Sequence, residues 1–183
     1  MKKVNIKWFY LIILSIIWGS SFILIKKSLI GLTPYQIGSL RNVLSGIILI
    51  AFACKGLKKI DKIKWKWIII SGFLGSFFPA FLFAIAETEI DSSVTSILNS
   101  LVPLNTVLMG AAIFKIASTK RQVIGVIIGF VGTAILILKG ADINPNQNYL
   151  YASYIIVATL MYAANVNIIK RHLQTVKPLT IAA

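Results

Sequence analysis

WIIISGFLGSFFPAFLFAIA, residues 67–86, decides the fold class of this chain. The stretch carries no charge and has the length that an α-helix needs to cross about 30 Å of hydrocarbon. KGLKKIDKIKWK, residues 55–66, precedes it with six lysines, and ETEID, residues 87–91, follows it with three acidic residues. Because cytoplasmic loops are enriched in Lys and Arg, this pattern predicts a membrane-spanning helix whose first residue lies at the cytoplasmic side.

Five more apolar stretches of similar length share the chain with this one. The hydrophobic fraction is 57% and the mean hydropathy is +0.85. Backbone groups in lipid must be satisfied internally, and these stretches are too long and too uniformly apolar for barrel strands. The sequence therefore predicts an all-α membrane protein, a polytopic bundle of about six transmembrane helices. The spans are expected near Trp8–Ile25, Ile37–Cys54, Trp67–Ala86, Ser93–Phe114, Val123–Leu138 and Tyr149–Ile169.

Most of the 19 basic residues lie at the N-terminus, in the second and fourth gaps between spans, and in the tail. The alternation predicts a multi-pass protein of the cell (cytoplasmic) membrane with both termini cytoplasmic. The pair Lys26 and Lys27, in the first gap, is an exception to this alternation of basic residues. In a soluble protein a net charge of +14 would suggest nucleic acid, but the topology already explains the charge. We expect the lipid bilayer as a partner and no nucleic acid.

Residues for catalysis or metal binding are scarce. The chain has one cysteine, Cys54, and one histidine, His172, which follows two basic residues and has no nearby acid. An intramembrane enzyme would need a nucleophile with a base, or paired metal ligands, on facing helices. We therefore expect no enzyme, no catalytic residue, no metal site and no cofactor.

Small residues at helical spacing predict where helices pack closely. Gly125, Gly129 and Gly132 lie along one side of the fifth span, and Gly72 and Gly75 lie in the third. Small side chains let helix backbones approach each other, so tight packing is favoured over a role in gating.

The fourth span carries the clearest polar pattern. Ser92, Ser96, Asn99, Pro103 and Thr106 recur at steps of four and three, which places them on one stripe of an α-helix. Such a stripe either joins helices by hydrogen bonds or lines a water-filled path. Its proline, like Pro79 in the third span, removes a backbone hydrogen bond and predicts a kink.

Arg41 is the one formal charge well inside a span. Its side chain either snorkels to the outer interface or faces inward, where it would attract an anionic substrate group or pair with Glu87 or Glu89. No Asp or Glu lies in the middle of a span, so the sequence does not predict a proton relay through a mid-membrane carboxylate.

The first and last spans resemble each other at an offset of 144 residues. Seven positions are identical, among them the pairs Lys26 with Lys170 and Pro34 with Pro178. The second copy is the sixth span, five spans after the first, and because five is an odd number it would enter the membrane from the opposite side. Inverted repeats of this kind are typical of secondary transporters, whose substrate site lies near the midplane between repeats.

The order of these features resembles an EamA-type transporter of the drug/metabolite transporter superfamily, whose members generally have ten spans in two inverted five-helix repeats. The resemblance rests on WGSSF at residues 18–22, Arg41, the fourth span from Ser93 to Pro103, and the fifth-span glycines. It implies a first repeat at residues 1–140, and at 141–183 the first helix of a second, incomplete repeat. The family often has an acidic residue just beyond the fourth span, where this chain has FKIAS at residues 114–118.

The resemblance implies a transporter, a permease or exporter, that moves small metabolites or drugs by alternating access and is here truncated. The alternative is a non-transporting membrane subunit, or a short chain active only as an oligomer. Partners would be a small-molecule substrate and either a second chain or the missing second repeat. We expect eight residues to form the translocation path: Trp18, Ser21, Arg41, Ser96, Asn99, Pro103, Tyr162 and Asn165.

Overall fold

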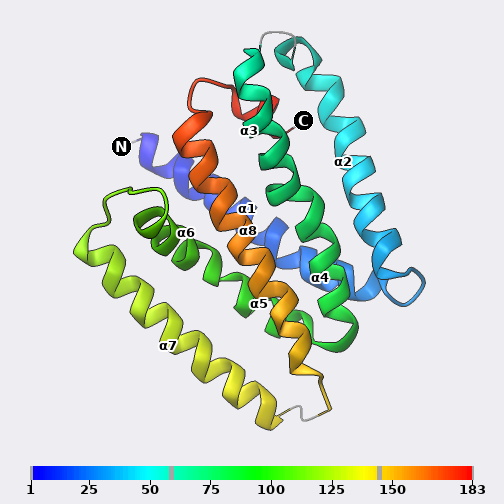
Figure 1. Ribbon diagram of the computed structural model, residues 1–183. Helices are drawn as coiled ribbons and strands as arrows, with labels where there is room; N and C mark the ends of the chain where they lie inside the picture. The colour runs from blue at the N-terminus through cyan, green and yellow to red at the C-terminus, as the bar shows by residue number, and fades with distance from the viewer. Residues whose placement is uncertain (1, 58–59, 144–145, 183) are drawn as a thin grey trace.

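The computed structural model is all-helical over the residues that it describes, 2–57, 60–143 and 146–182 (Figure 1). Side chains are described for these residues except 2–5, 7, 54, 55, 136, 137 and 140–143. The helices are α1 (Lys2–Ser28), α2 (Pro34–Leu57), α3 (Lys62–Gly72), the π-turn η1 (Phe73–Phe77), α4 (Phe78–Glu89), α5 (Ser92–Asn99), α6 (Leu101–Ala112), α7 (Lys120–Ile143), the 3₁₀ turn η2 (Tyr149–Tyr151), α8 (Ala152–His172) and α9 (Pro178–Ala182).

Five helical stretches of the described residues are long and apolar enough to cross a membrane. They overlap with five of the six predicted spans, and the predicted bundle of membrane helices is confirmed. The remaining predicted span, Val123–Leu138, lies within α7, several of whose side chains fall outside the described residues. The five stretches are Trp8–Ser28, Pro34–Ala53, Lys62–Glu89, Ser92–Ala112 and Tyr149–His172.

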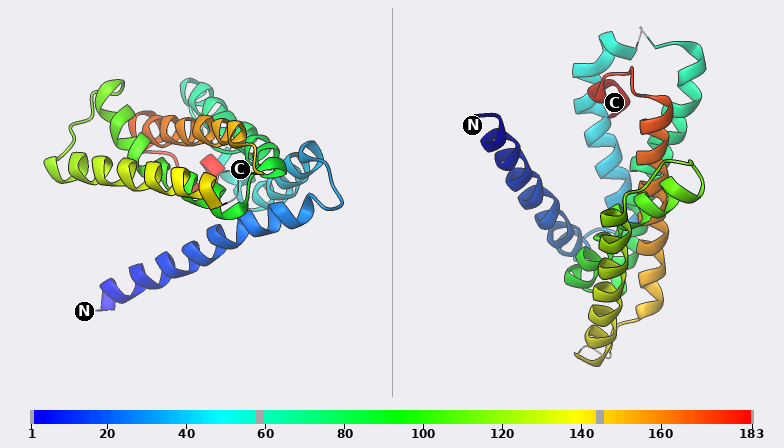
Figure 2. Two further views of the ribbon diagram at one scale, coloured as in Figure 1. Left: turned by 90° about the horizontal axis from the view of Figure 1, so that it is seen from below. Right: turned by 90° about the vertical axis from the view of Figure 1, so that its left-hand side faces the viewer.

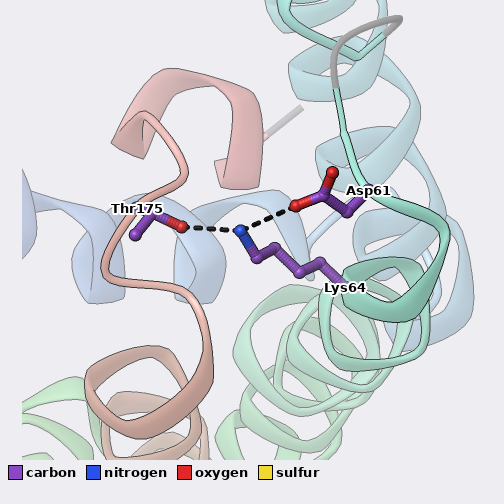
Figure 3. A network of polar contacts seen from close by, with 3 residues as sticks. All are labelled: Asp61, Lys64 and Thr175. Atoms are coloured by element: carbon purple, nitrogen blue, oxygen red, sulfur yellow. Dashed lines mark hydrogen bonds and ion pairs between the residues drawn. The ribbon is translucent and has the colours of Figure 1, made fainter.

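Connections between helices gather at two ends of the bundle. At the first, which we call the Lys64 end, the α2–α3 and α8–α9 connections lie close together, and the α6–α7 connection contacts the end of α8. The Lys64 ammonium donates to the Thr175 hydroxyl oxygen at 2.8 Å (Figure 3). Arg171 Nη1 donates to the carbonyl oxygen of Phe114 at 3.1 Å. These two bonds join three segments that are distant in the sequence.

At the second end, which we call the Glu87 end, the end of α1 meets the α4–α5 and α7–α8 connections. The Lys26 ammonium donates to the carbonyl oxygens of Glu87 at 2.7 Å and of Ile90 at 3.0 Å. Gln147 Nε2, just before α8, donates to the carboxylate of Asp91. The last turn of α1 and the first turn of α8 therefore lie at the same end, so the two helices run in opposite directions through the bundle.

Helix α8 is the centre of the bundle and packs against α4 and α6 (Figure 1). Small residues line these contacts: Ala84 of α4 and Ala158 and Ala163 of α8 are fully buried. Short side chains allow two helix backbones to approach, which is how helices associate where lipid removes the usual hydrophobic driving force. Hydrogen bonds add to the contact, since Asn105 Nδ2 donates to the Thr159 hydroxyl oxygen at 3.0 Å.

Helices α1, α2 and α7 lie at the periphery. Both views of Figure 2 show the N-terminal half of α1 projecting away from the other helices. Its side chains Ile16 and Trp18 are 65% and 66% exposed, and Ile47 of α2 and Ile128 of α7 are 65% and 67% exposed. Exposed apolar faces of this extent suit contact with lipid or with further membrane helices.

The glycine stripe of α7 does not mediate close packing among the described residues. A Cβ atom built on Gly125 or Gly132 would meet nothing within 4 Å, and on Gly129 only a Leu104 methyl at 3.9 Å. The close approach occurs in the third span instead. A Cβ atom on Gly75 would lie 2.1 Å from Asn165 Nδ2 of α8, whereas Gly72 is open. Spacing identified small residues but not which of them a neighbouring helix covers.

Both predicted proline breaks are present. Pro79 cannot donate to the carbonyl of Gly75, and the helix widens there into η1, where the Phe78 N–H bonds to the Phe73 carbonyl. In the fourth span, α5 ends and α6 begins at Ser100, whose N–H is shared between the carbonyls four and three residues before it, at 3.2 and 3.0 Å. Pro103, three residues later, leaves the Asn99 carbonyl without its usual helical donor.

Candidate functional site

A cavity of about 570 Å³ lies between α1, α2, the η1 turn, the α5–α6 break and α8. Both irregular points of the backbone border it: Gly75 lies in η1, and Ser100 separates α5 from α6. In membrane proteins, non-helical backbone is tolerated where it is buried in protein or lines a cavity. The two prolines therefore widen the bundle at the same place.

Seven of the eight residues expected in the translocation path line this one cavity. They come from four separated parts of the chain, and their role in transport stays a prediction. They are Trp18 and Ser21 of α1, Arg41 of α2, Asn99 and Pro103 at the α5–α6 break, and Tyr162 and Asn165 of α8.

Ser96, the eighth, does not line the cavity. It lies on α5 one turn before Ser100, and its side chain is exposed. The fourth-span stripe thus divides: Asn99 and Pro103 line the cavity, while the Ser92 hydroxyl donates to the Phe22 carbonyl at 3.2 Å and joins two helices. Ser96 and Asn99 both belong to α5, so the stripe divides within one helix, whereas Asn99 and Pro103, on either side of the break at residue 100, line the same cavity.

Two amides are among the polar groups of the cavity. The side-chain oxygen of Asn99 is buried and has no hydrogen-bond partner among the described residues. Asn165 Oδ1 accepts a hydrogen bond from the Ser71 hydroxyl at 2.5 Å, which holds its amide against Gly75. Because a buried carbonyl oxygen without a partner costs about 1–3 kcal/mol, Asn99 is ready to accept a hydrogen bond from a ligand.

Aromatic rings form one wall. Phe83 of α4 stacks on Tyr162 with ring centroids 6.0 Å apart and lies 5.5 Å from Phe22. Phe83 is buried, whereas Trp18 across the cavity is 66% exposed, so the cavity reaches the surface beside α1. Flat apolar groups would pack well against these rings.

Among the described residues that line the cavity, Arg41 is the one that carries a charge. Its side chain is exposed, and no described carboxylate lies within 4.0 Å of it. The predicted direct ion pair with Glu87 or Glu89 is therefore absent from the described residues. Arg41 nevertheless lies close enough to Glu87 and Tyr162 for its charge to interact electrostatically with both side chains.

Sequence reasoning missed several residues of the lining. Phe22 belongs to the WGSSF segment, and Gly75 was assigned to packing alone. Phe83 carried no signal, since an aromatic residue in an apolar span is usually core. The other lining residues that were not predicted are Ser100, Val102 and Val166.

The residues considered above for catalysis or metal binding do not form such a site among the described residues. His172 stacks on Trp67 at 3.7 Å with the rings nearly parallel, which is a packing contact at the Lys64 end. Among the described residues there is no group of three or more His, Cys, Asp or Glu side chains that could hold a metal ion.

Comparison with known proteins identifies the family. The model of the EamA-like transporter family matches residues 6–138. The chain belongs to the EamA-like transporter family. An uncharacterized transporter of Archaeoglobus fulgidus is 28% identical over 182 residues, which are 97% of this chain and 62% of that protein. The chain thus spans less than two thirds of that relative. No solved structure matches the chain.

Membership of this family agrees with the helical membrane fold and indicates a transporter rather than an enzyme. EamA-like proteins are multi-pass membrane transporters and not enzymes, so the chain is a membrane protein whose family acts on small molecules in a lipid bilayer. The expected absence of enzymatic activity rests on this membership. Substrate, direction of transport and orientation in the membrane belong to the proposal that follows.

Proposed function

We propose that this EamA-family chain acts as a secondary transporter, a permease or exporter, and that the 570 Å³ cavity is its substrate site. The observation that carries the proposal is the buried Asn99 oxygen, which lacks a partner among the described residues and lies where the fourth span is broken. Half-helix ends and freed backbone groups at mid-membrane are the usual substrate contacts in secondary transporters.

The lining indicates the kind of substrate. Phe22, Phe83 and Tyr162 offer flat apolar surface, and Asn99 and Asn165 offer hydrogen bonds. Small organic molecules with an apolar body and hydrogen-bonding groups fit this combination. A cation at the rim, Arg41, would favour a substrate with an anionic group on that side.

We further propose that α8 and α9 begin a second repeat with inverted topology. Helix α8 runs opposite to α1, and Pro34 and Pro178, equivalent at the offset of 144, each start a helix, α2 and α9. Transport would then proceed by rocking of the two repeats around the cavity. The domains are 1–140 and 141–183.

The orientation is also part of the proposal. The Lys64 end would face the cytoplasm of a cell whose cytoplasmic membrane holds the chain, because the connections with most basic residues meet there. A cysteine placed at exposed Ile63, in a Cys54→Ser background, should react with an impermeant thiol reagent in inside-out vesicles and not in right-side-out vesicles. The reverse pattern would invert the orientation.

Flux measurements test the transport proposal. Vesicles containing the chain would be assayed with labelled amino acids, nucleosides and an amphipathic dye. Asn99→Ala and Arg41→Ala should each reduce the flux of a transported probe at least several-fold, whereas Ser96→Ala, an exposed serine of the same span, should leave it unchanged. Unchanged flux in both cavity variants would overturn the site, and no flux of any probe would favour a non-transporting subunit.

A further inference from the structure

Glu87, at the end of α4, is a fully buried acidic residue in this membrane bundle. Neither of its carboxylate oxygens has a hydrogen-bond partner among the described residues. Glu89, two positions later, is exposed. A charged carboxylate is costly in apolar surroundings unless it is paired, and ionisable residues inside membrane helices therefore tend to be functional.

Two cations lie near Glu87, and one of them, Lys26, is engaged with backbone oxygens. The Lys26 ammonium donates to the backbone carbonyls of Glu87 and Ile90 at 2.7 and 3.0 Å, and it makes no ion pair within 4.0 Å of the carboxylate. Arg41, on α2, acts on Glu87 from the cavity rim. The Glu87 carboxylate therefore has two positive charges nearby but contacts neither of them directly. This arrangement fits a neutral, protonated side chain.

Polar groups face this region from every element packed against α4 at the Glu87 end. Two of these groups are hydroxyls that are buried with no partner among the described residues, those of Thr95 and Tyr149. The groups are Lys26 of α1, Arg41 of α2, Asp91, Ser92 and Thr95 at the start of α5, Tyr149 and Tyr151 of η2, and Tyr162 of α8. Asp91 is bonded to Gln147, so it is not the group that awaits a partner.

Phe83 connects Glu87 to the cavity through helix α4. Phe83 precedes Glu87 by four residues and so lies on the same face of α4. It lines the cavity and contacts Phe22 of α1 and Tyr162 of α8. A change in the position of α4 at Glu87 would therefore move one wall of the cavity.

We propose that Glu87 is a proton-binding site coupled to the conformation of the cavity, so that transport by this chain is linked to proton movement. The proposal rests on the transport function proposed above. The carboxylate takes one proton from the aqueous phase that it faces in one conformation and becomes a neutral acid. It returns this proton to the aqueous phase that it faces in the other. When ionised, Glu87 attracts Lys26 and Arg41 and draws α1 and α2 against α4; when protonated, it releases them.

Infrared difference spectroscopy on the full chain in lipid nanodiscs tests the titration without any substrate. A carbonyl band of a protonated carboxylic acid should disappear as the pH is raised from about 4 to about 9. The band should be lost in Glu87→Gln and kept in Glu89→Gln, the exposed control. A band that survives in Glu87→Gln, or that is absent from the wild-type chain, would overturn the proposal.

Thiol labelling tests the coupling. In a Cys54→Ser background, the labelling rate of Ser100→Cys in the cavity is divided by that of Tyr35→Cys on the exposed start of α2, which removes the intrinsic pH dependence of the reagent. The ratio should change several-fold with the same midpoint as the infrared band. A ratio that is constant while the band titrates would show a carboxyl group uncoupled from the cavity and would overturn the proposal.

Glu87→Asp keeps the test valid if Glu87→Gln does not fold. This variant retains a carboxyl group on a shorter side chain, so the midpoint of the labelling ratio should move; an unmoved midpoint would overturn the assignment to Glu87. The transport and coupling proposals fail separately. If probe flux persists but does not change with an imposed pH gradient, the proton-coupling proposal is overturned and the transport proposal stands. If no flux is measured while the infrared band still titrates and the labelling ratio still changes, the transport proposal is overturned and the proton-binding site stands.

Discussion

Lys64, in the first turn of α3, donates a hydrogen bond to the hydroxyl oxygen of Thr175, 111 residues further along the chain, at 2.8 Å (Figure 3). The same ammonium lies 3.0 Å from the carboxylate of Asp61. The three side chains join the α2–α3 connection to the α8–α9 connection beside a small pocket of about 290 Å³. They thus tie the first repeat to the start of the proposed second one.

This link should be weak, because the Lys64 and Asp61 side chains are 29% and 71% exposed. Solvent screening reduces such pairs to about 0–1 kcal/mol. A double-mutant cycle of Lys64→Met and Thr175→Val, read from thermal unfolding in detergent, should give a coupling energy below about 1 kcal/mol. The exposed Lys62→Met serves as control. A coupling above about 2 kcal/mol would mean that this end is held shut more firmly than its exposure allows.

Lys26 should contribute far more to stability than its neighbour Lys27. Its ammonium bonds two carbonyl oxygens at the Glu87 end, whereas the side chain of Lys27 is exposed. Hydrogen bonds to charged groups contribute about 1.5–3 kcal/mol, so Lys26→Met should lower the free energy of unfolding by about 2 kcal/mol. Lys27→Met should change it little. Equal effects of the two substitutions would contradict the contact.

Gly75 and Gly72 offer a matched pair in the third span. Gly75→Ala would place a Cβ atom 2.1 Å from the Asn165 amide, and overpacking of this kind costs about 1–3 kcal/mol. Gly72→Ala meets nothing within 4 Å and should gain up to about 1 kcal/mol from helix propensity. Thermal unfolding separates the two. Because Asn165 would move, Gly75→Ala should also reduce probe flux, and a fully active, stable variant would be inconsistent with the structure.

For the glycines of α7 that no described residue contacts, we expect substitution by Ala not to destabilise the chain, in contrast to Gly75→Ala. Gly125→Ala and Gly132→Ala should be neutral or stabilise the chain by about 0.5–1 kcal/mol each, since no side chain of the described residues lies within 4 Å of a Cβ atom at either position. Gly110→Ala, as the contrasting control, would push against Asn167 Oδ1 at 2.9 Å and should destabilise. Loss of flux or of assembly in the α7 variants would indicate that another membrane segment packs on this face.

Comparison of prediction and structure shows which structural features each kind of sequence pattern predicts. Hydrophobic length located the spans, since the cost of placing polar groups in lipid acts on each segment by itself. The proline positions located both helix breaks, because a missing N–H is a local property. The direction in which a side chain faces was harder to predict: the step of three and four residues grouped Ser96 with Asn99, but only Asn99 lines the cavity although both lie on α5. The same limit applies to Gly125, whose spacing suggested a contact that the described residues do not make.

The sequence by itself determined the membrane class, the alternation of the connections and most of the residues that meet in the cavity, because these depend on composition and local backbone chemistry. Only the tertiary structure decided that Glu87 is buried while Glu89 is exposed. Both residues stand at the end of one span and look alike in the sequence. Their difference arises because α1, α2 and α8 cover one side of α4 and leave the other open, and that packing follows from contacts between segments far apart in the chain.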